Sequence, residues 1–175
     1  MKLAQTLIKG GPEHRKFLRQ IFVSVDITAP LYWWKEMDTY KIGTTANSTS
    51  TMHKLTSKPI TLDCFETDDF NTELEYYQGN TTGMLSELMI EQLEFLRQKY
   101  LETKDKKYWK ELVRWLPESW LQTRTFTCNY EVIRTIVHQR ENHKLNEWSG
   151  QDDSSKDNFI KWAKSLPYAE ELIFS

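Results

Sequence analysis

The stretch LPESWLQTRTFTCNYEVIRTIVHQRENHKLNEW, residues 116–148, is the most informative part of the chain. From Asn129 onward, apolar residues recur at helical spacing and mark the inward face of a helix: Val132, Ile133, Ile136 and Val137. Arg140 falls four residues after Ile136 and three after Val137, so it lies on the same stripe. A charged side chain on an inward face needs a partner.

The spacing between Asn129 and Arg140 admits two interpretations. Eleven residues are about three helical turns, which places the two side chains at nearly the same angle and ~16 Å apart along the axis. A polar residue at each end of an apolar stripe suits an elongated ligand with polar ends. Alternatively, Asn129 caps the helix and Arg140 pairs with a buried carboxylate.

Upstream of this stretch, the sequence predicts a strand followed by a helix. Residues 20–27, QIFVSVDI, alternate between apolar and mostly polar side chains, the period of a half-buried strand. The helix is predicted over residues 28–40, TAPLYWWKEMDTY, with Thr28 as a possible N-cap and Pro30 in the first turn.

The middle of the chain alternates between polar and apolar segments. Residues 38–56 are rich in Ser, Thr and Asn, a composition that by itself favours a linker. Residues 58–66 are predicted as a second strand and residues 66–83 as an acidic loop. Residues 84–101 have the spacing of a long helix, and we expect the charged run 102–110 to be its solvated exit. Its inward face is predicted to hold Leu85, Leu88, Met89, Leu93, Leu96 and Tyr100.

Composition limits the possible partners. The 175 residues are 39% apolar and 13% aromatic, enough for one domain with a core. Charged residues nearly cancel to a net charge of −2, which argues against bulk electrostatic binding of nucleic acid or of a membrane. The opening apolar run is too short for a secretory signal, and no stretch approaches the ~20 apolar residues of a membrane span. We therefore expect a cytoplasmic protein, and no metal, because Asp68 and Asp69 lack metal-ligand spacing.

The stretch 116–148 resembles the C-terminal half of the flavin-dependent thymidylate synthases, which methylate dUMP to dTMP with reduced FAD and methylenetetrahydrofolate. That family has a Leu-Pro, a Thr-x-Asn, an Arg eleven residues after the Asn, and then an Ala-Gln. The corresponding positions of this chain are Leu116-Pro117, Thr127-x-Asn129, Arg140 and Leu145-Asn146.

The N-terminal half is similar to the same family. The family has a His upstream of an Ala-Pro at the separation found here between His14 and Ala29-Pro30. Its Asn-x-x-Ser places are held by Asn47 and Ser50. The resemblance therefore spans nearly the whole chain, and it makes the polar stretch 38–56 the expected nucleotide-binding loop.

The resemblance implies a fold, a reaction and two sets of contacts. The fold is α/β (α+β), a small sheet flanked by long helices, in a single domain over residues 1–175. The co-substrates of an active enzyme are methylenetetrahydrofolate and NADPH, and the family assembles as a homotetramer. The implied contacts with dUMP are Ser50, Arg140, Lys41 and Asn47, and those with FAD are His14, Asn129, Tyr40 and Asn146.

The chain departs from the family at the signature Arg-His-Arg, where it has Thr39-Tyr40-Lys41. It also has Met52-His53 where the family has Arg-Tyr. An ammonium group cannot reproduce the bidentate fork of a guanidinium at a phosphate. Two alternatives therefore stay open: a related flavin or nucleotide enzyme that acts on another pyrimidine, and a non-catalytic member that keeps the fold for nucleotide binding or assembly.

Overall fold

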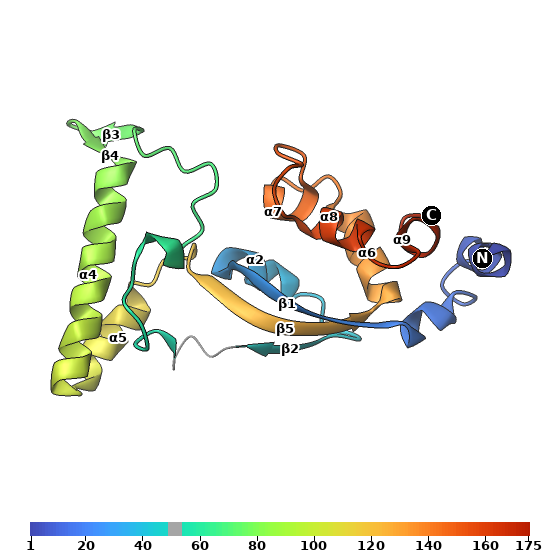
Figure 1. Cartoon of the computed structure of the whole chain (residues 1–175), viewed down its shortest axis with the longest axis horizontal. Coiled ribbons are helices and arrows are strands. Elements are labelled where there is room, and N and C mark those ends of the chain that lie inside the picture. The colour runs from blue at the N-terminus through green and yellow to red at the C-terminus, as the bar shows by residue number, and fades with distance from the viewer. Residues whose placement is uncertain (49–53) are drawn as a thin grey trace. The chain divides into compact units, whose positions relative to one another are not determined.

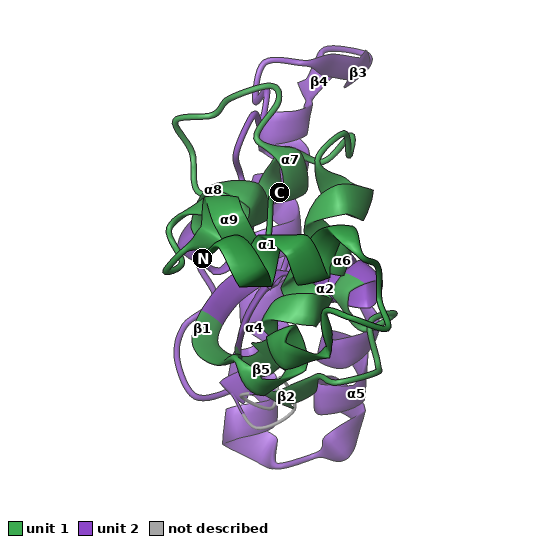
Figure 2. Cartoon of the chain, turned by 90° about the vertical axis from the view of Figure 1, so that its right-hand side faces the viewer, with its two compact units in different colours: residues 1–26, 37–47, 125–175 green, residues 27–36, 48–124 purple. Residues whose placement is uncertain are grey.

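The computed structural model describes residues 1–48 and 54–175. The chain forms two compact units (Figure 2). Unit 1 comprises residues 1–26, 37–47 and 125–175, and unit 2 comprises residues 27–36 and 48–124. The single domain expected over residues 1–175 stays a prediction, because a chain with two compact units can form either one domain or two.

The described chain contains a three-stranded sheet (Figure 1). Its strands, in the order β1-β5-β2, are β1 at Phe22–Pro30, β5 at Leu121–Asn129 and β2 at Thr45–Ser48. The strand predicted at residues 20–27 is thus confirmed as part of β1, with Val23, Val25 and Ile27 half-buried on one face. Together with its helices, the sheet confirms the predicted α+β class.

The other face of β1 bonds to β5 through side chains. Three hydrogen bonds join the two strands: Ser24 to Thr127 at 2.9 Å, Thr125 to Asp26 at 2.6 Å, and Thr28 to Thr123 at 2.7 Å. The residue number rises along β1 as it falls along β5, so the two strands run antiparallel. Every second residue takes part, as the period of a strand requires, and these bonds fix the register of the pair.

Unit 1 is a cluster of short helices around α6, which spans Tyr130–Arg140. Ile133, Ile136 and Val137 of α6 are fully buried, which confirms the helix and its predicted inward face. The other helices of the unit are α1 at Lys2–Lys9, η1 at Lys16–Gln20, α7 at Asn146–Ser149, α8 at Phe159–Lys164 and α9 at Ala169–Leu172. Trp148 and Phe159 bring α7 and α8 together, with ring centroids 5.4 Å apart.

The helix α2, Leu31–Met37, continues directly from β1, and all of it but Met37 belongs to unit 2. The Trp34 indole donates a hydrogen bond to the carbonyl of Gln122 at 2.9 Å, and its ring lies under the Arg124 guanidinium at 4.4 Å. These contacts anchor α2 to the first residues of β5. The aromatic helix predicted over residues 28–40 is therefore confirmed, although it begins after Pro30 because β1 extends to that residue.

The longest helix of the described chain is α4, Thr82–Thr103, which packs against α5, Lys106–Arg114. Leu93, Leu96 and Leu112 are buried in their shared core. The solvated exit predicted at residues 102–110 is confirmed for residues 102–107, which are exposed, but the run continues into α5, where residues 108 and 109 are half-buried. Lys104 takes a left-handed conformation that ends α4, and the Asp105 side chain caps the next helix.

One face of α4 exposes apolar side chains. Leu85 and Leu88 are 50% and 64% exposed, and Phe95 is 51% exposed. The prediction that Leu85 and Leu88 face inward was therefore wrong, since on α4 the contact with the core begins at Met89, which is partly buried, and full burial begins at Leu93. Residues 85, 88 and 95 are spaced by three and seven, so they form one apolar stripe along the helix.

Two other segments differ from prediction. Residues 58–66 form no strand beyond an isolated bridge of Phe65 with Trp120; instead Leu62–Cys64 is a 3₁₀ turn, η2. The acidic loop contains a small hairpin, β3 at Glu75–Tyr77 and β4 at Asn80–Thr81. Gln78 and Gly79 close it with positive φ angles of 48° and 77°, the backbone that a two-residue hairpin turn requires.

A buried ion pair ties residues 54–60 to α4. Arg97 is 8% exposed and donates to both carboxylate oxygens of Glu94 at 2.7 Å and to the Thr56 carbonyl at 3.2 Å. Glu94 also accepts the backbone N–H of Ile60 at 2.9 Å. The hydrogen bond from Arg97 is the main reason that the pKa of Glu94 falls to about 2.

No helix of the described ranges is long and apolar enough to cross a membrane. Residues 1–48 and 54–175 also contain no group of three or more His, Cys, Asp or Glu side chains that could hold a metal ion. The cytoplasmic location stays a prediction.

We predict that Glu94→Gln lowers the free energy of unfolding at pH 7 by ~1–3 kcal/mol, because it weakens a charge-assisted hydrogen bond to a buried guanidinium. The folded-state pKa of about 2 lies below the ordinary value of 4.5, so the contribution of Glu94 is full above pH 4.5 and is lost as the pH falls toward 2. The stability gap between wild type and variant, measured by urea unfolding, therefore narrows between pH 5 and pH 3. The matched control is Glu91→Gln, an exposed carboxylate on the same helix; a gap that is constant with pH would contradict the assignment.

Candidate functional site

The β5–α6 junction sets the geometry of the candidate site. Asn129 ends β5 and is the N-cap of α6; its side-chain oxygen accepts the backbone N–H of Val132 at 3.1 Å. The prediction that Asn129 caps this helix is therefore confirmed. At the opposite end of α6, Arg140 is the last helical residue. The helix thus holds these two polar side chains eleven residues apart, ~16 Å along its axis.

Arg140 lies close to two aromatic rings. Its Nε donates a hydrogen bond to the Tyr40 hydroxyl at 2.9 Å, and its Cζ lies 4.9 Å from the Trp148 ring centroid and 5.6 Å from that of Tyr40. The Tyr40 hydroxyl in turn donates to the side-chain oxygen of Gln139 at 2.9 Å. Each cation–π contact of a guanidinium with an aromatic ring contributes ~0.5–2 kcal/mol. Arg140 is thus an oriented, half-buried cation.

The segment that follows Tyr40 runs along α6. Tyr40 contacts the C-terminal end of α6 through Gln139, whereas a Cβ added at Gly43 would lie 3.2 Å from the Nδ2 of Asn129, at the N-terminal end. Gly43 has a φ of 73°, so the close approach and the backbone both favour glycine there. Lys41 lies between these contacts and is exposed to solvent. The structure thus brings Tyr40, Lys41, Asn129 and Arg140 to one helix.

Asn47 and Ser50 belong to the same polar stretch. Asn47 is exposed in the short strand β2. Ser50, predicted to contact dUMP, lies outside the described residues.

His14 occupies a loop before η1, where its ring packs over Gly10 and stays exposed. The next residue, Arg15, donates from Nε to both carboxylate oxygens of Glu131 at 3.0 Å. Since Glu131 is in the first turn of α6, this pair ties the His14 loop to the N-terminal end of α6. The structure gives no direct contact between His14 and the other predicted site residues that it describes.

Asn146 organises the loop after α7. Its side-chain oxygen accepts the backbone N–H groups of Asp152 and Asp153 at 3.1 and 3.0 Å, and its nitrogen donates to the Asp153 carbonyl at 3.1 Å. These bonds occupy most of the hydrogen-bonding capacity of the amide. In this structure Asn146 therefore supports the loop that follows Trp148.

A basic cluster lies on another side of α6. Arg134 donates to the carbonyl of Ile173 at 2.7 Å, and burial followed by repulsion from Arg15 lowers its pKa. The pKa of His138 is lowered chiefly by burial and next by Arg134. Neither Arg134 nor His138 takes part in the hydrogen bond between Tyr40 and Arg140. The bond from Arg134 to Ile173 holds the C-terminal residues against α6.

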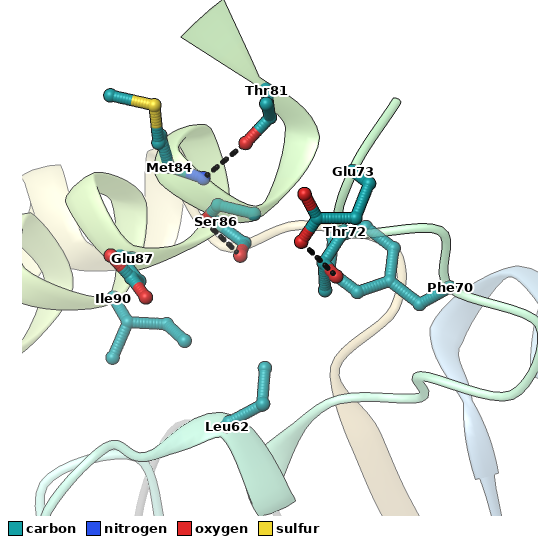
Figure 3. A pocket seen from close by; sticks show the side chains of 10 residues that line it. Leu62, Phe70, Thr72, Glu73, Thr81, Met84, Ser86, Glu87 and Ile90 are labelled. Atoms are coloured by element: carbon teal, nitrogen blue, oxygen red, sulfur yellow. Dashed lines mark hydrogen bonds between the residues drawn. The ribbon is translucent and has the colours of Figure 1, made fainter. Parts of the chain in front are cut away.

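A cavity of about 400 Å³ lies in unit 2, where the loop before β3 faces the start of α4 (Figure 3). Phe70, Met84 and Ile90 supply apolar surface, and Glu73 and Glu87 supply two carboxylates. None of its ten lining residues is basic, so it does not suit a phosphate. It also contains none of the predicted site residues.

The architecture matches solved structures along nearly its whole length. The crystal structure of a flavin-dependent thymidylate synthase from Helicobacter pylori, complexed with FAD and dUMP, superposes with a TM-score of 0.64 over 99% of this chain and 81% of that one. The chain has the fold of a flavin-dependent thymidylate synthase. The sequences share 15% identity, so the likeness extends to the fold alone.

Two further structures support the thymidylate synthase fold. A second H. pylori structure with FAD and dUMP gives a TM-score of 0.62 at 17% identity, over 99% of this chain and 80% of that one. A UMP/dUMP methylase from Streptomyces cacaoi, bound with 5-Br UMP, gives 0.57 at 12% identity, over 98% and 83% of the two chains. No protein-family model matches the chain, and no curated protein matches its sequence.

Sequence reasoning missed Trp148 and Gln139 as neighbours of Arg140. Trp148 comes eight residues after Arg140, beyond the end of α6, so helical periodicity says nothing of its position. Gln139 directly precedes Arg140 on an outward face of the helix, where a polar side chain is expected and indicates no particular contact. The hydroxyl of Tyr40 bonds to Gln139 and to Arg140, and the contact with Arg140 spans 100 residues of sequence.

We predict that Asn129→Ala lowers the free energy of unfolding by ~1 kcal/mol, because the first turn of α6 loses its side-chain acceptor. Asn129→Asp keeps an acceptor at the positive end of the helix dipole, and we expect most of the stability to return. Urea unfolding of both variants at pH 7 measures the difference. An equal loss in the two would show that the amide nitrogen facing Gly43, and not the cap, stabilises the junction.

Proposed function

We propose that the chain binds dUMP and FAD and methylates dUMP to dTMP, as a divergent enzyme with the flavin-dependent thymidylate synthase fold. The observation that carries this proposal is the oriented Arg140 guanidinium at the end of α6, within a fold whose solved examples hold FAD and dUMP. Arg140, Lys41, Asn47 and Ser50 would contact the nucleotide.

The fit to a nucleotide phosphate rests on the cations. Arg140 supplies a planar guanidinium held by stacking, and Lys41 supplies an exposed ammonium on the adjacent segment. A guanidinium suits bidentate recognition of phosphate, while a lysine adds a point charge that can move to the ligand. One oriented and one mobile cation match the charge of a nucleoside monophosphate.

The fit to FAD rests on His14 and Asn129. His14 is exposed, and the Nδ2 of Asn129 faces Gly43 without a hydrogen bond to another described residue. The hydroxyl of Tyr40 and the amide of Asn146 already bond within the chain. His14 and Asn129 would therefore hold the cofactor, with Tyr40 and Asn146 supporting the surrounding loops.

Reduced FAD, when bound, would supply the reducing equivalents that convert a transferred one-carbon unit into a methyl group. The protein would contribute orientation: Arg140 and Lys41 would fix the phosphate, and Asn47 and Ser50 would also contact the nucleotide. Methylenetetrahydrofolate and NADPH are the proposed co-substrates.

The likeness to a UMP/dUMP methylase favours a second candidate, an enzyme that modifies UMP or another pyrimidine nucleotide. Replacement of the Arg-His-Arg signature by Thr39-Tyr40-Lys41 favours a third, a nucleotide-binding protein without catalysis. Flavin absorbance of the purified protein separates a flavoprotein from the third candidate. Rescue of a thymidine-requiring strain separates dUMP methylation from both alternatives.

We predict that dUMP binds to the wild-type chain in calorimetry and that Arg140→Met weakens it at least tenfold, ~1.4 kcal/mol. Lys41→Ala weakens it less, because an exposed ammonium contributes little until the ligand desolvates it. Lys9→Ala, at an exposed position of α1, controls for the loss of one positive charge. Equal affinity of wild type and Arg140→Met would remove Arg140 from the nucleotide site.

We also propose that the chain forms a homotetramer, supported by the apolar stripe of Leu85, Leu88 and Phe95 on α4. Light scattering is expected to give four times the chain mass of 20.9 kDa at micromolar concentration. Leu88→Glu places a charge in the stripe and is expected to lower the mass. A wild-type mass equal to one chain would refute the tetramer.

A further inference from the structure

Residues 59–96 concentrate negative charge in unit 2. They contain nine Asp and Glu side chains and no Lys, Arg or His, although the whole chain has a net charge of only −2. The same residues supply the whole lining of the cavity at the start of α4 (Figure 3). A concentration of one sign of charge around a hollow attracts cations and repels phosphates and carboxylates. The ligand that suits this cavity is therefore of a different class from dUMP and FAD.

The cavity has a fixed shape because its loop wall is bonded to the start of α4. The backbone N–H groups of Thr82 and Gly83 donate to the carbonyls of Leu74 and Thr72 at 3.0 and 2.9 Å, and the Thr82 hydroxyl donates to the carbonyl of Asn71. A Cβ at Gly83 would lie 3.0 Å from the Thr72 carbonyl oxygen, so glycine permits this close approach. The volume of about 400 Å³ lies within the ~300–1,000 Å³ typical of small-molecule sites.

Two carboxylates lie on different walls of the cavity. Glu87 comes from α4 and Glu73 from the loop before β3 (Figure 3). Glu87 makes no hydrogen bond or ion pair with another described residue, and the Glu73 carboxylate accepts a long hydrogen bond of 3.5 Å from the Thr72 hydroxyl. An ionised carboxylate only accepts hydrogen bonds, so the ligand has to supply the donors. The described residues offer no group of three metal-ligating side chains, which favours an organic cation over a metal ion.

The other walls are largely apolar. Leu62 of η2, Phe70 of the loop, and Met84 and Ile90 of α4 line the cavity around the carboxylates (Figure 3). Leu62, Phe70 and Met84 are exposed, so a ligand that covers them removes apolar surface from water. The ring of Phe70 also offers an aromatic face to a cation. A ligand that matches these walls therefore needs an apolar body beside its charged group.

We propose that this cavity binds a small organic ammonium ion with an aromatic or branched apolar body. The ammonium group donates to the carboxylates of Glu73 and Glu87, and the apolar body lies against Phe70, Met84 and Ile90. The site is independent of the proposed function, because none of its residues is assigned to the nucleotide or to the flavin.

The first test compares three probes by calorimetry at pH 7 and physiological salt, which screens charges outside the cavity. Phenethylammonium has both the charge and the apolar body. The isosteric 2-phenylethanol has the body without the charge, and the capped peptide Gly-Lys-Gly has an ammonium group without an aromatic body. We expect phenethylammonium to bind about tenfold more tightly than either control, because only this probe combines a charge-assisted hydrogen bond with apolar burial.

Three results of this comparison would overturn the proposal. The first is no binding of phenethylammonium at millimolar concentration. The second is equal affinity for 2-phenylethanol, which would show that the carboxylates do not recognise the ligand. The third is equal or tighter binding of the lysine peptide, which would assign this surface to a basic segment of a protein partner.

The second test uses Glu73→Gln and Glu87→Gln to locate the bound ammonium. Each variant removes one charge at an exposed position and keeps the size of the side chain, and circular dichroism checks that it folds. We expect each to weaken phenethylammonium about fivefold through the loss of a charged acceptor. Glu91→Gln is the matched control, because it removes one charge a helical turn beyond Glu87 and outside the cavity lining, and we expect it to bind as wild type does. Unchanged binding in both cavity variants, or an equal loss in Glu91→Gln, would overturn the site.

Discussion

The hydrogen bond from the Val132 N–H to the Asn129 side chain is the contact on which the site depends. It stands where β5 ends and α6 begins, and it converts an extended backbone into a helix at one defined residue. Tyr130 is the first residue of α6, and its backbone N–H bonds to the carbonyl of Ile21, just before β1. The start of α6 is therefore fixed to the sheet. A helix that starts at a fixed residue also ends in a fixed direction. The position of Arg140 around the helix axis therefore follows from a start that lies three turns away.

Sequence patterns could predict elements whose partners are local. The alternation in residues 20–27 and the apolar spacing of Ile133, Ile136 and Val137 each report one buried face, and both elements are present. Leu85 and Leu88 show the same helical spacing, yet they are exposed. Periodicity detects a stripe, but whether the stripe is covered depends on what lies opposite. In this chain, α5 covers only the later turns of α4.

The candidate site was only partly readable for a related reason. The resemblance to flavin-dependent thymidylate synthases singled out Asn129, Tyr40 and Arg140, which the structure brings to one helix. It did not indicate that Tyr40 bonds to Arg140, because the two are 100 residues apart and no periodic pattern links them. Trp148 was invisible as a neighbour because its position depends on packing with Phe159 after the chain has turned. The sequence thus carried the identities of the polar groups, whereas their orientation comes from long-range packing.

The side-chain ladder between β1 and β5 limits how this chain can tolerate changes of length. A one-residue insertion within β5 would turn every following side chain to the opposite face of the sheet and separate the hydroxyl pairs that lie beyond it. Asn129 would then approach α6 from the wrong side of the strand. The turn at Gln78 and Gly79 and the residues between α7 and α8 lie outside this ladder, so an insertion there leaves the register of β1 and β5 unchanged. Tags, labels or grafted peptides therefore belong in those connections, and the span from β5 to Arg140 behaves as a segment of fixed length.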